Sequence, residues 1–270
     1  MSRLSELMFV GLGLNSEENM SLLGLEEARK ADTVFIELYT SLMPELDLNK
    51  LEKLIGKHVH MILRHDLEED SGKIILQAAD KARTVLLVPG DPLIATTHVD
   101  LRIRAEKQGI KTGIVHGASI VSAAIGLSGL QNYKFGRSVT VPFSNTNSPD
   151  ATPYNVIGEN LKMGLHTLCF LDILAEERRH MTIRDALDLL FTLERNKRHR
   201  VLTDNTLAVG IARGGSDNPA VIADFAGQLQ KFSFGKPPHT LIFPGKLHFM
   251  EAEALVTLGK APRIILEMTK

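Results

Sequence analysis

The stretch LLVPGDPLIATT, residues 86–97, leads from an apolar strand directly into a stiff turn. Gly90 gives the backbone the freedom that a tight turn needs, and Pro89 and Pro92 restrict it on either side. These residue types predict a following helix, with Asp91 as its N-cap and Pro92 in its first position. However, the end of a buried strand is also where open α/β sheets bind ligands. Taken alone, the stretch is equally consistent with a helix cap and with a binding loop.

Around this stretch, short apolar strands alternate with helical patterns. Strands are predicted at 7–13, 32–38, 59–63, 84–90 and 111–117, and helices at 16–31, 49–56, 71–82 and 94–109. Ser16 is the expected N-cap of the first helix. Because the strands are apolar throughout, they indicate a mostly parallel sheet that is covered on both faces.

The second half of the chain has a different pattern. Strands are predicted at 137–143, 165–173, 206–215, 220–228 and 239–245, helices at 155–164, 181–197 and 246–258, and a loop at 144–154. Thr182 is a candidate helix cap, and the turn at 217–219 predicts a hairpin, which requires a mixed sheet. We therefore expect two α/β domains, residues 1–116 with a mostly parallel sheet and residues 117–270 with a mixed sheet.

Composition narrows the functional class. The chain has 270 residues, 44% apolar and 23% charged, with a formal net charge of −1. This balance gives no general reason to expect nucleic-acid binding, and the dense basic segment 194–200 is interpreted as a solvated helix end. No apolar run approaches the roughly 20 residues of a membrane span, so a cytoplasmic protein is expected. The single cysteine, Cys169, lies in an apolar strand and is expected to be inert packing.

Glycines near the N-terminus suggest one alternative function. The segment FVGLGLNS, residues 9–16, places Gly11 and Gly13 at the end of a strand, and Glu37 ends the next strand, where a ribose-binding acid would lie. However, a dinucleotide-binding fingerprint needs a third glycine, and that position is Ser16. A nicotinamide-dependent oxidoreductase is therefore the weaker alternative.

Metal binding is not expected. The closest histidines are His58, His60 and His65, and the chain has neither an HExxH motif nor cysteine-rich ligand spacing.

Several motifs, in this order, resemble the tetrapyrrole-methylase fold family of S-adenosylmethionine-dependent methyltransferases and, within it, the diphthine synthases of archaeal type. The motifs are GLGL (11–14), ELYTSLM (37–43), PGDPLIATTH (89–98), HGASI (116–120), YKFG (133–136), GLHTLCFLDI (164–173), ARGGS (212–216) and PPHTLIFPGKLH (237–248). The resemblance spans essentially the whole chain. It implies a homodimer of two-domain subunits, with S-adenosyl-L-methionine bound between the domains and S-adenosyl-L-homocysteine as its product.

The resemblance also implies a set of cofactor-binding positions. They are Leu14 on the floor of the site, Asp91 and Ile94 beside the methionine and ribose, Ser119 and Ile120 on the opposite wall, and Leu171, Gly214 and His239 on the adenine side. Two dipeptides depart from the expected pattern. Gly117–Ala118 stands in place of Ala-Pro, and Gly214–Gly215 in place of Ala-Gly.

The implied reaction methylates the amino group of a 3-amino-3-carboxypropyl extension on a modified histidine of translation elongation factor 2, giving diphthine. The amine would displace the sulfonium in line, so the protein mainly supplies alignment and desolvation. No general base is nominated. Arg213 or Lys246 is a candidate partner for the substrate carboxylate. Within the same fold, methylation of a porphyrinoid ring or of a ribosomal RNA ribose is the alternative.

Overall fold

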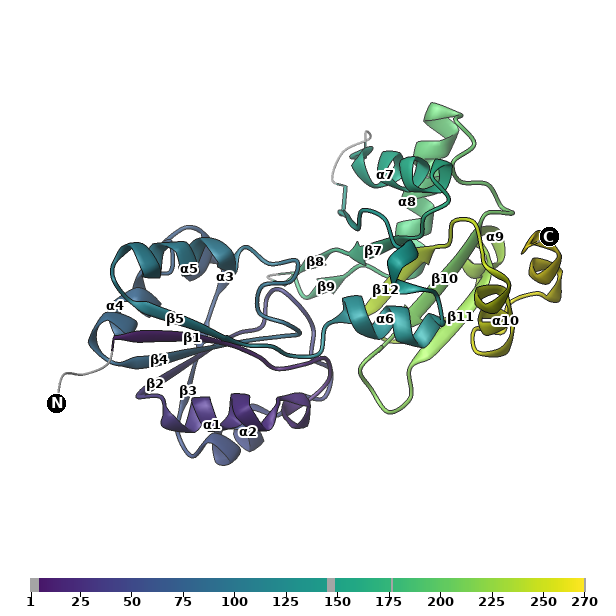
Figure 1. The fold of residues 1–270 in the computed structure, drawn as a ribbon. Coiled ribbons are helices and arrows are strands. Elements are labelled where there is room, and N and C mark those ends of the chain that lie inside the picture. The colour runs from purple at the N-terminus through teal and green to yellow at the C-terminus, as the bar shows by residue number, and fades with distance from the viewer. Residues whose placement is uncertain (1–4, 145–148, 176, 270) are drawn as a thin grey trace. The chain divides into compact units, whose positions relative to one another are not determined.

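The computed structural model describes residues 5–144, 149–175 and 177–269 (Figure 1). Its backbone divides into two compact units, residues 1–120 and 121–270. The division falls after Ile120, four residues beyond the boundary that the sequence suggested.

The first unit is built on a parallel sheet of five strands. They are β1 (Glu6–Gly11), β2 (Thr33–Glu37), β3 (Val59–Ile62), β4 (Arg83–Val88) and β5 (Lys111–Val115), in the order β3-β2-β4-β1-β5. Every pairing in this sheet is parallel, which confirms the predicted sheet. The carboxyl ends of all five strands therefore share one edge, and β1 lies between β4 and β5 at that edge.

Helices cover both faces of this sheet (Figure 1). On one face, α1 (Leu22–Lys30) and α2 (Leu48–Ile55) pack against the buried side chains of β1, β2 and β4. On the other, α4 (Lys73–Lys81) and α5 (His98–Lys107) bury Ile75 and Leu101. A short helix, α3 (Arg64–Glu68), precedes α4. This two-sided burial explains why the central strands β1, β2 and β4 are apolar almost throughout, whereas the edge strands β3 and β5 are only partly buried.

Two helix starts differ from the prediction. Ser16 precedes a short 3₁₀ turn, η1 (Glu17–Asn19), and α1 is capped instead by Ser21, whose hydroxyl accepts from Gly24 N at 3.0 Å. The second difference concerns Asp91, which is not the N-cap of α5. That helix begins at His98 after a turn over 91–97 in which Ala95 has a φ of 56°, a left-handed conformation that interrupts any helix.

The second unit contains a mixed five-stranded sheet. Its strands are β6 (Val139–Val141), β7 (Thr167–Leu171), β10 (Leu207–Ala212), β11 (Ala220–Phe225) and β12 (His239–Phe243), in the order β11-β10-β12-β7-β6. The β10–β11 hairpin is antiparallel and β6–β7 is parallel, so the predicted hairpin and mixed sheet are confirmed. A small pair, β8 (Ile173–Leu174) and β9 (Arg179–His180), was not predicted.

The helices of the second unit are α6 (Ile120–Ser128, which starts at the last residue of the first unit), α7 (Thr152–Lys162), α8 (Ile183–Lys197), α9 (Ala226–Leu229) and α10 (Phe249–Thr257), with 3₁₀ turns η2 (Asn132–Lys134) and η3 (Arg263–Thr269). Thr182 caps α8 as predicted, since its hydroxyl accepts from Asp185 N. Several bounds were wrong: α7 begins within the expected loop, β10 ends at Ala212 rather than at residue 215, 226–228 is helical, and α10 begins at Phe249. Part of that expected loop, 145–148, lies outside the described residues.

No helix in the described ranges is long and apolar enough to cross a membrane.

Candidate cofactor site

Two glycines connect the carboxyl ends of β1 and β4 in the first sheet. Gly13 N donates to Gly90 O at 3.2 Å, and Gly90 N donates to Gly13 O at 2.7 Å. Both residues have positive φ values, 77° and 70°, which only glycine adopts without strain. The GLG and PGD motifs are therefore two halves of one backbone arrangement.

Gly117, two residues past the end of β5, completes this arrangement. A Cβ on Gly11 would lie 2.5 Å from Gly90 O and 2.6 Å from Gly117 N, and a Cβ on Gly117 would lie 2.3 Å from Gly90 O. No side chain fits at either position. We call Gly11, Gly13, Gly90 and Gly117 the glycine cluster. It leaves backbone, rather than side chains, at the place where parallel sheets receive ligands.

Asp91 and His116 are in contact at the same edge. His116 Nδ1 lies 2.7 Å from Asp91 Oδ2, with the Asp91 side chain nearly buried and that of His116 75% exposed. Because β1 separates β4 from β5, this contact bridges two strands that are not neighbours. Asp91 was predicted from the sequence as a site residue, whereas His116 was not. The signal that could have found it is that His116 directly follows β5, a strand predicted to be parallel to β4.

The other predicted residues of the first unit lie in loops at this edge. Leu14 follows the glycine turn after β1 and is half-buried, and Ile94 follows β4 and is 46% exposed. Ser119 and Ile120 follow β5 and are half-buried. The structure therefore gathers five of the eight predicted positions on three adjacent strand ends.

The remaining three positions lie together at one end of three neighbouring strands of the second sheet. Leu171 ends β7, Gly214 lies two residues past β10, and His239 begins β12. The register pairs Ala212 with His239 and Thr240 with Phe170, so the three positions are neighbours although they are distant in sequence.

His239 carries the strongest sign of a ligand in the second unit. Its Nδ1 accepts from Ile183 N at 3.3 Å, so a neutral ring carries its proton on Nε2. That Nε2 is buried and makes no hydrogen bond of good geometry among the described residues, although the backbone carbonyls of Lys236 and Gly235 lie near the ring. Burial lowers the pKa of His239, against a smaller opposing effect of the nearby Lys236 carbonyl. An unpaired buried donor is costly unless something else accepts from it.

Arg213 is already engaged within the second unit. Its Nη1 donates to Phe234 O at 2.8 Å and to Lys236 O at 2.7 Å. The guanidinium thus holds the loop that precedes His239. Lys246, the other cation suggested from the sequence, has an exposed side chain.

Glu37 does not match the role of a ribose-binding acid. Its side chain is fully buried, and its Oε2 accepts from Tyr39 N and Thr40 N at 3.0 and 3.1 Å. Burial is the main reason why its pKa rises to about 7, against those hydrogen bonds. Glu37 closes the turn after β2 and is not open to a sugar hydroxyl, which removes a main support for the oxidoreductase alternative.

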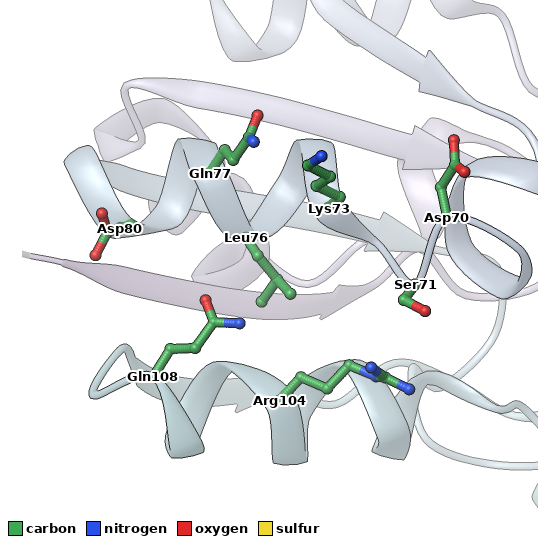
Figure 2. A pocket seen from close by; sticks show the side chains of 8 residues that line it. All are labelled: Asp70, Ser71, Lys73, Leu76, Gln77, Asp80, Arg104 and Gln108. Atoms are coloured by element: carbon green, nitrogen blue, oxygen red, sulfur yellow. The ribbon is translucent and has the colours of Figure 1, made fainter.

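A surface groove of about 420 Å³ lies elsewhere on the first unit (Figure 2). It is lined by Asp70, Ser71, Lys73, Leu76, Gln77, Asp80, Arg104 and Gln108. These residues come from the α3–α4 turn, α4 and the end of α5, and carry both signs of charge. None is a predicted site residue, and we assign the groove no function.

One possible group of metal ligands occurs among the described residues. Ligand atoms of His65, Asp66 and Asp70 lie within 4.8 Å of one another. His65 and Asp70 are exposed. The other two histidines considered from the sequence do not join it: His58 Nδ1 lies 2.6 Å from Glu52 Oε1, and the His60 ring packs against Phe35.

The chain resembles proteins of known family along its whole length. Residues 6–230 match the family model for tetrapyrrole (corrin/porphyrin) methylases. A diphthine synthase of Methanosarcina acetivorans is 47% identical over 269 residues, which is 98% of this chain and 100% of the relative. That of Methanocaldococcus jannaschii is 44% identical, covering 92% of this chain and 97% of the relative.

A solved structure agrees with these matches. A crystal structure of diphthine synthase superposes with a TM-score of 0.87 at 42% identity and covers 97% of this chain and 99% of its own. Sequence and fold thus agree over nearly the full length, and the chain belongs to the tetrapyrrole methylase family and, within it, to the diphthine synthases.

Proposed function

We propose that this chain binds S-adenosylmethionine and transfers its methyl group to the amino group of a 3-amino-3-carboxypropyl-modified histidine, giving diphthine. The observation that carries the proposal is the glycine cluster, where the ends of β1, β4 and β5 meet without side chains. The tetrapyrrole methylases use this cofactor, and relatives that match nearly the full chain are diphthine synthases.

The residues present fit such a cofactor. In the first unit, the glycine cluster keeps side chains out of the strand ends beside Leu14, Asp91, Ile94, Ser119 and Ile120. In the second unit, the unpaired Nε2 of His239 lies at the sheet edge with Leu171 and Gly214, and is a donor to a ring nitrogen or hydroxyl. We propose these eight residues as the cofactor-binding set.

The protein's part in the reaction is to position the amine. When bound, the cofactor supplies an activated methyl group, so alignment and exclusion of water account for most of the rate gain. A cation is needed for the carboxylate of the substrate extension. Because Arg213 is engaged with two carbonyls while the Lys246 side chain is exposed, we propose Lys246.

The proposed protein substrate is translation elongation factor 2, and the proposed assembly is a homodimer. Sedimentation of the pure protein tests the assembly. A monomer at micromolar concentration would contradict it.

Two experiments test the function. Calorimetric titration should detect binding of S-adenosylhomocysteine and no binding of NAD; the reverse result would overturn the cofactor assignment.

The second experiment is mass spectrometry of elongation factor 2 that carries the unmethylated extension. After incubation with this protein and the cofactor, the modified histidine should gain the mass of whole methyl groups. An unchanged mass, with cofactor bound, would leave methylation of a porphyrinoid or of RNA as the remaining activities of the fold.

A further inference from the structure

We infer that His116 accepts the proton that the substrate amine must lose before methyl transfer, and that Asp91 positions it for this role. The inference rests on the proposed function and adds a catalytic residue to it. It starts from the contact between His116 Nδ1 and Asp91 Oδ2, 2.7 Å apart.

A reacting amine needs a free lone pair. An aliphatic amino group carries a proton at neutral pH, since even the α-amino group of a peptide has a reference pKa of about 8. A side chain that takes up this proton within the site typically contributes a rate factor of about 10² to 10⁴. Such a group must be accessible, hold an unprotonated nitrogen, and be fixed in orientation.

His116 meets these three requirements. Its side chain is 75% exposed, whereas that of Asp91 is nearly buried. An ionised carboxylate can only accept hydrogen bonds, so Nδ1 must be the protonated nitrogen of a neutral ring. The free lone pair is therefore on Nε2, which points away from Asp91.

The glycine cluster fixes the orientation of the pair. Asp91 directly follows Gly90 and His116 directly precedes Gly117, so both side chains leave backbone that is locked by close contact. Gly117 lies against Gly11 and Gly90 with no space for a Cβ. The pair can thus be placed reproducibly without any other side chain to hold it.

Proton and methyl transfer conserve atoms and electrons. The ammonium N–H bond breaks and its proton moves to His116 Nε2. The amine lone pair then forms the N–C bond to the methyl carbon while the C–S bond breaks, and that electron pair stays on sulfur in a neutral thioether. The exposed imidazolium releases its proton to water, which restores the base for a further transfer.

Two substitutions separate a base from a structural contact. In His116→Asn, the amide nitrogen replaces Nδ1 and keeps a donor to Asp91, but no acceptor replaces Nε2. In His116→Ala, both are lost. We expect both variants to lower kcat about 100-fold while S-adenosylhomocysteine affinity changes less than about threefold, and free imidazole to restore part of the kcat of His116→Ala. The exposed His199→Ala is the matched control and should behave as wild type.

A spectroscopic measurement does not depend on activity. In cofactor-free protein labelled with ¹⁵N-histidine, His116 should be in the Nδ1–H tautomer, and Asp91→Asn should shift it toward the Nε2–H form. Full activity in His116→Asn, an absence of imidazole rescue, or an Nε2–H tautomer in the wild type would overturn the inference. If the wild type neither binds S-adenosylhomocysteine nor methylates the factor, the proposed function itself fails.

Discussion

His98 Nε2 lies 3.7 Å from Glu37 Oε1, and both side chains are buried inside the first unit. Burial, the largest cause in each case, raises the pKa of Glu37 to about 7 and lowers that of His98 to about 4. At mildly acidic pH neither group therefore carries a charge, because Glu37 is protonated and His98 is still neutral. The pair joins the turn after β2 to the first residue of α5, which follows the 91–97 turn.

This pair predicts a pH dependence of stability. The folded-state pKa of Glu37 lies above the reference value of 4.5, so its contribution to the free energy of unfolding is highest below pH 4.5 and falls as the pH rises through 7. For Glu37→Gln we expect no such fall. Between pH 6.5 and 8.5 the wild type should lose about 1 kcal/mol relative to this variant, as measured by urea unfolding.

Measurements in this pH range report on the titration of Glu37 and not on that of His98. His98 has a lowered pKa, so its contribution to stability is present above pH 6.5 and is lost only as the pH falls toward 4. The exposed Glu18→Gln is the matched control and should follow the wild-type curve. Parallel curves for wild type and Glu37→Gln across the range would show that the pKa of Glu37 is not raised.

Glu251 should be the most costly carboxylate to remove from the second unit. It is fully buried, and it accepts from Gln131 N, His166 Nε2 and His248 N at 2.8–2.9 Å and from Lys134 Nζ. Although burial opposes the shift, these hydrogen bonds lower its pKa to about 2. The network joins η2, the residue before β7 and the start of α10.

Glu251→Ala leaves His166 and Lys134 without their shared partner, so we expect a loss of about 3–5 kcal/mol in the free energy of unfolding. Two residues along α10, Glu253→Ala removes an exposed carboxylate and should change the stability by less than about 0.5 kcal/mol. Equal effects of the two substitutions in thermal unfolding would mean that the network is not formed.

Cys169 should be unreactive in the folded protein. It is fully buried in β7, and burial alone raises the pKa of its thiol, so little thiolate forms. Iodoacetamide at pH 7.5 should leave the native protein unmodified and alkylate it fully in urea, as read by mass spectrometry. Rapid labelling of the native protein would contradict the packing of this strand.

The sheets could be predicted from the sequence because each strand carries its own apolar pattern. The turn after Gly90 could not, because Asp91 and Pro92 have the residue types of a helix start. The conformation there is decided by contacts from outside the segment, namely His116 with Asp91 and the backbone of Gly13 with Gly90. Local preference gives way to such tertiary contacts.

The candidate site could likewise be predicted only in part from the sequence. The order of the motifs indicated eight positions. Strand register explains why three of them, Leu171, Gly214 and His239, lie together, and no single motif could predict that they do. His116 was missed because its significance depends on a side chain 25 residues earlier in the chain. The unpaired Nε2 of His239 likewise depends on Ile183, which is distant in sequence.

Gly11→Ala tests whether the glycine cluster holds the site. The added Cβ would lie 2.5 Å from Gly90 O and 2.6 Å from Gly117 N, which are backbone atoms that cannot turn aside. The strand ends must separate, so we expect a loss of about 1–3 kcal/mol in stability and at least a tenfold loss of S-adenosylhomocysteine affinity. Gly126→Ala is the matched control, because a methyl group added to this exposed residue of α6 would meet no described neighbour within 4 Å, and the helix gains up to about 1 kcal/mol. If Gly11→Ala lost stability but bound the ligand as tightly as Gly126→Ala, the close approach of β1, β4 and β5 would serve the fold alone.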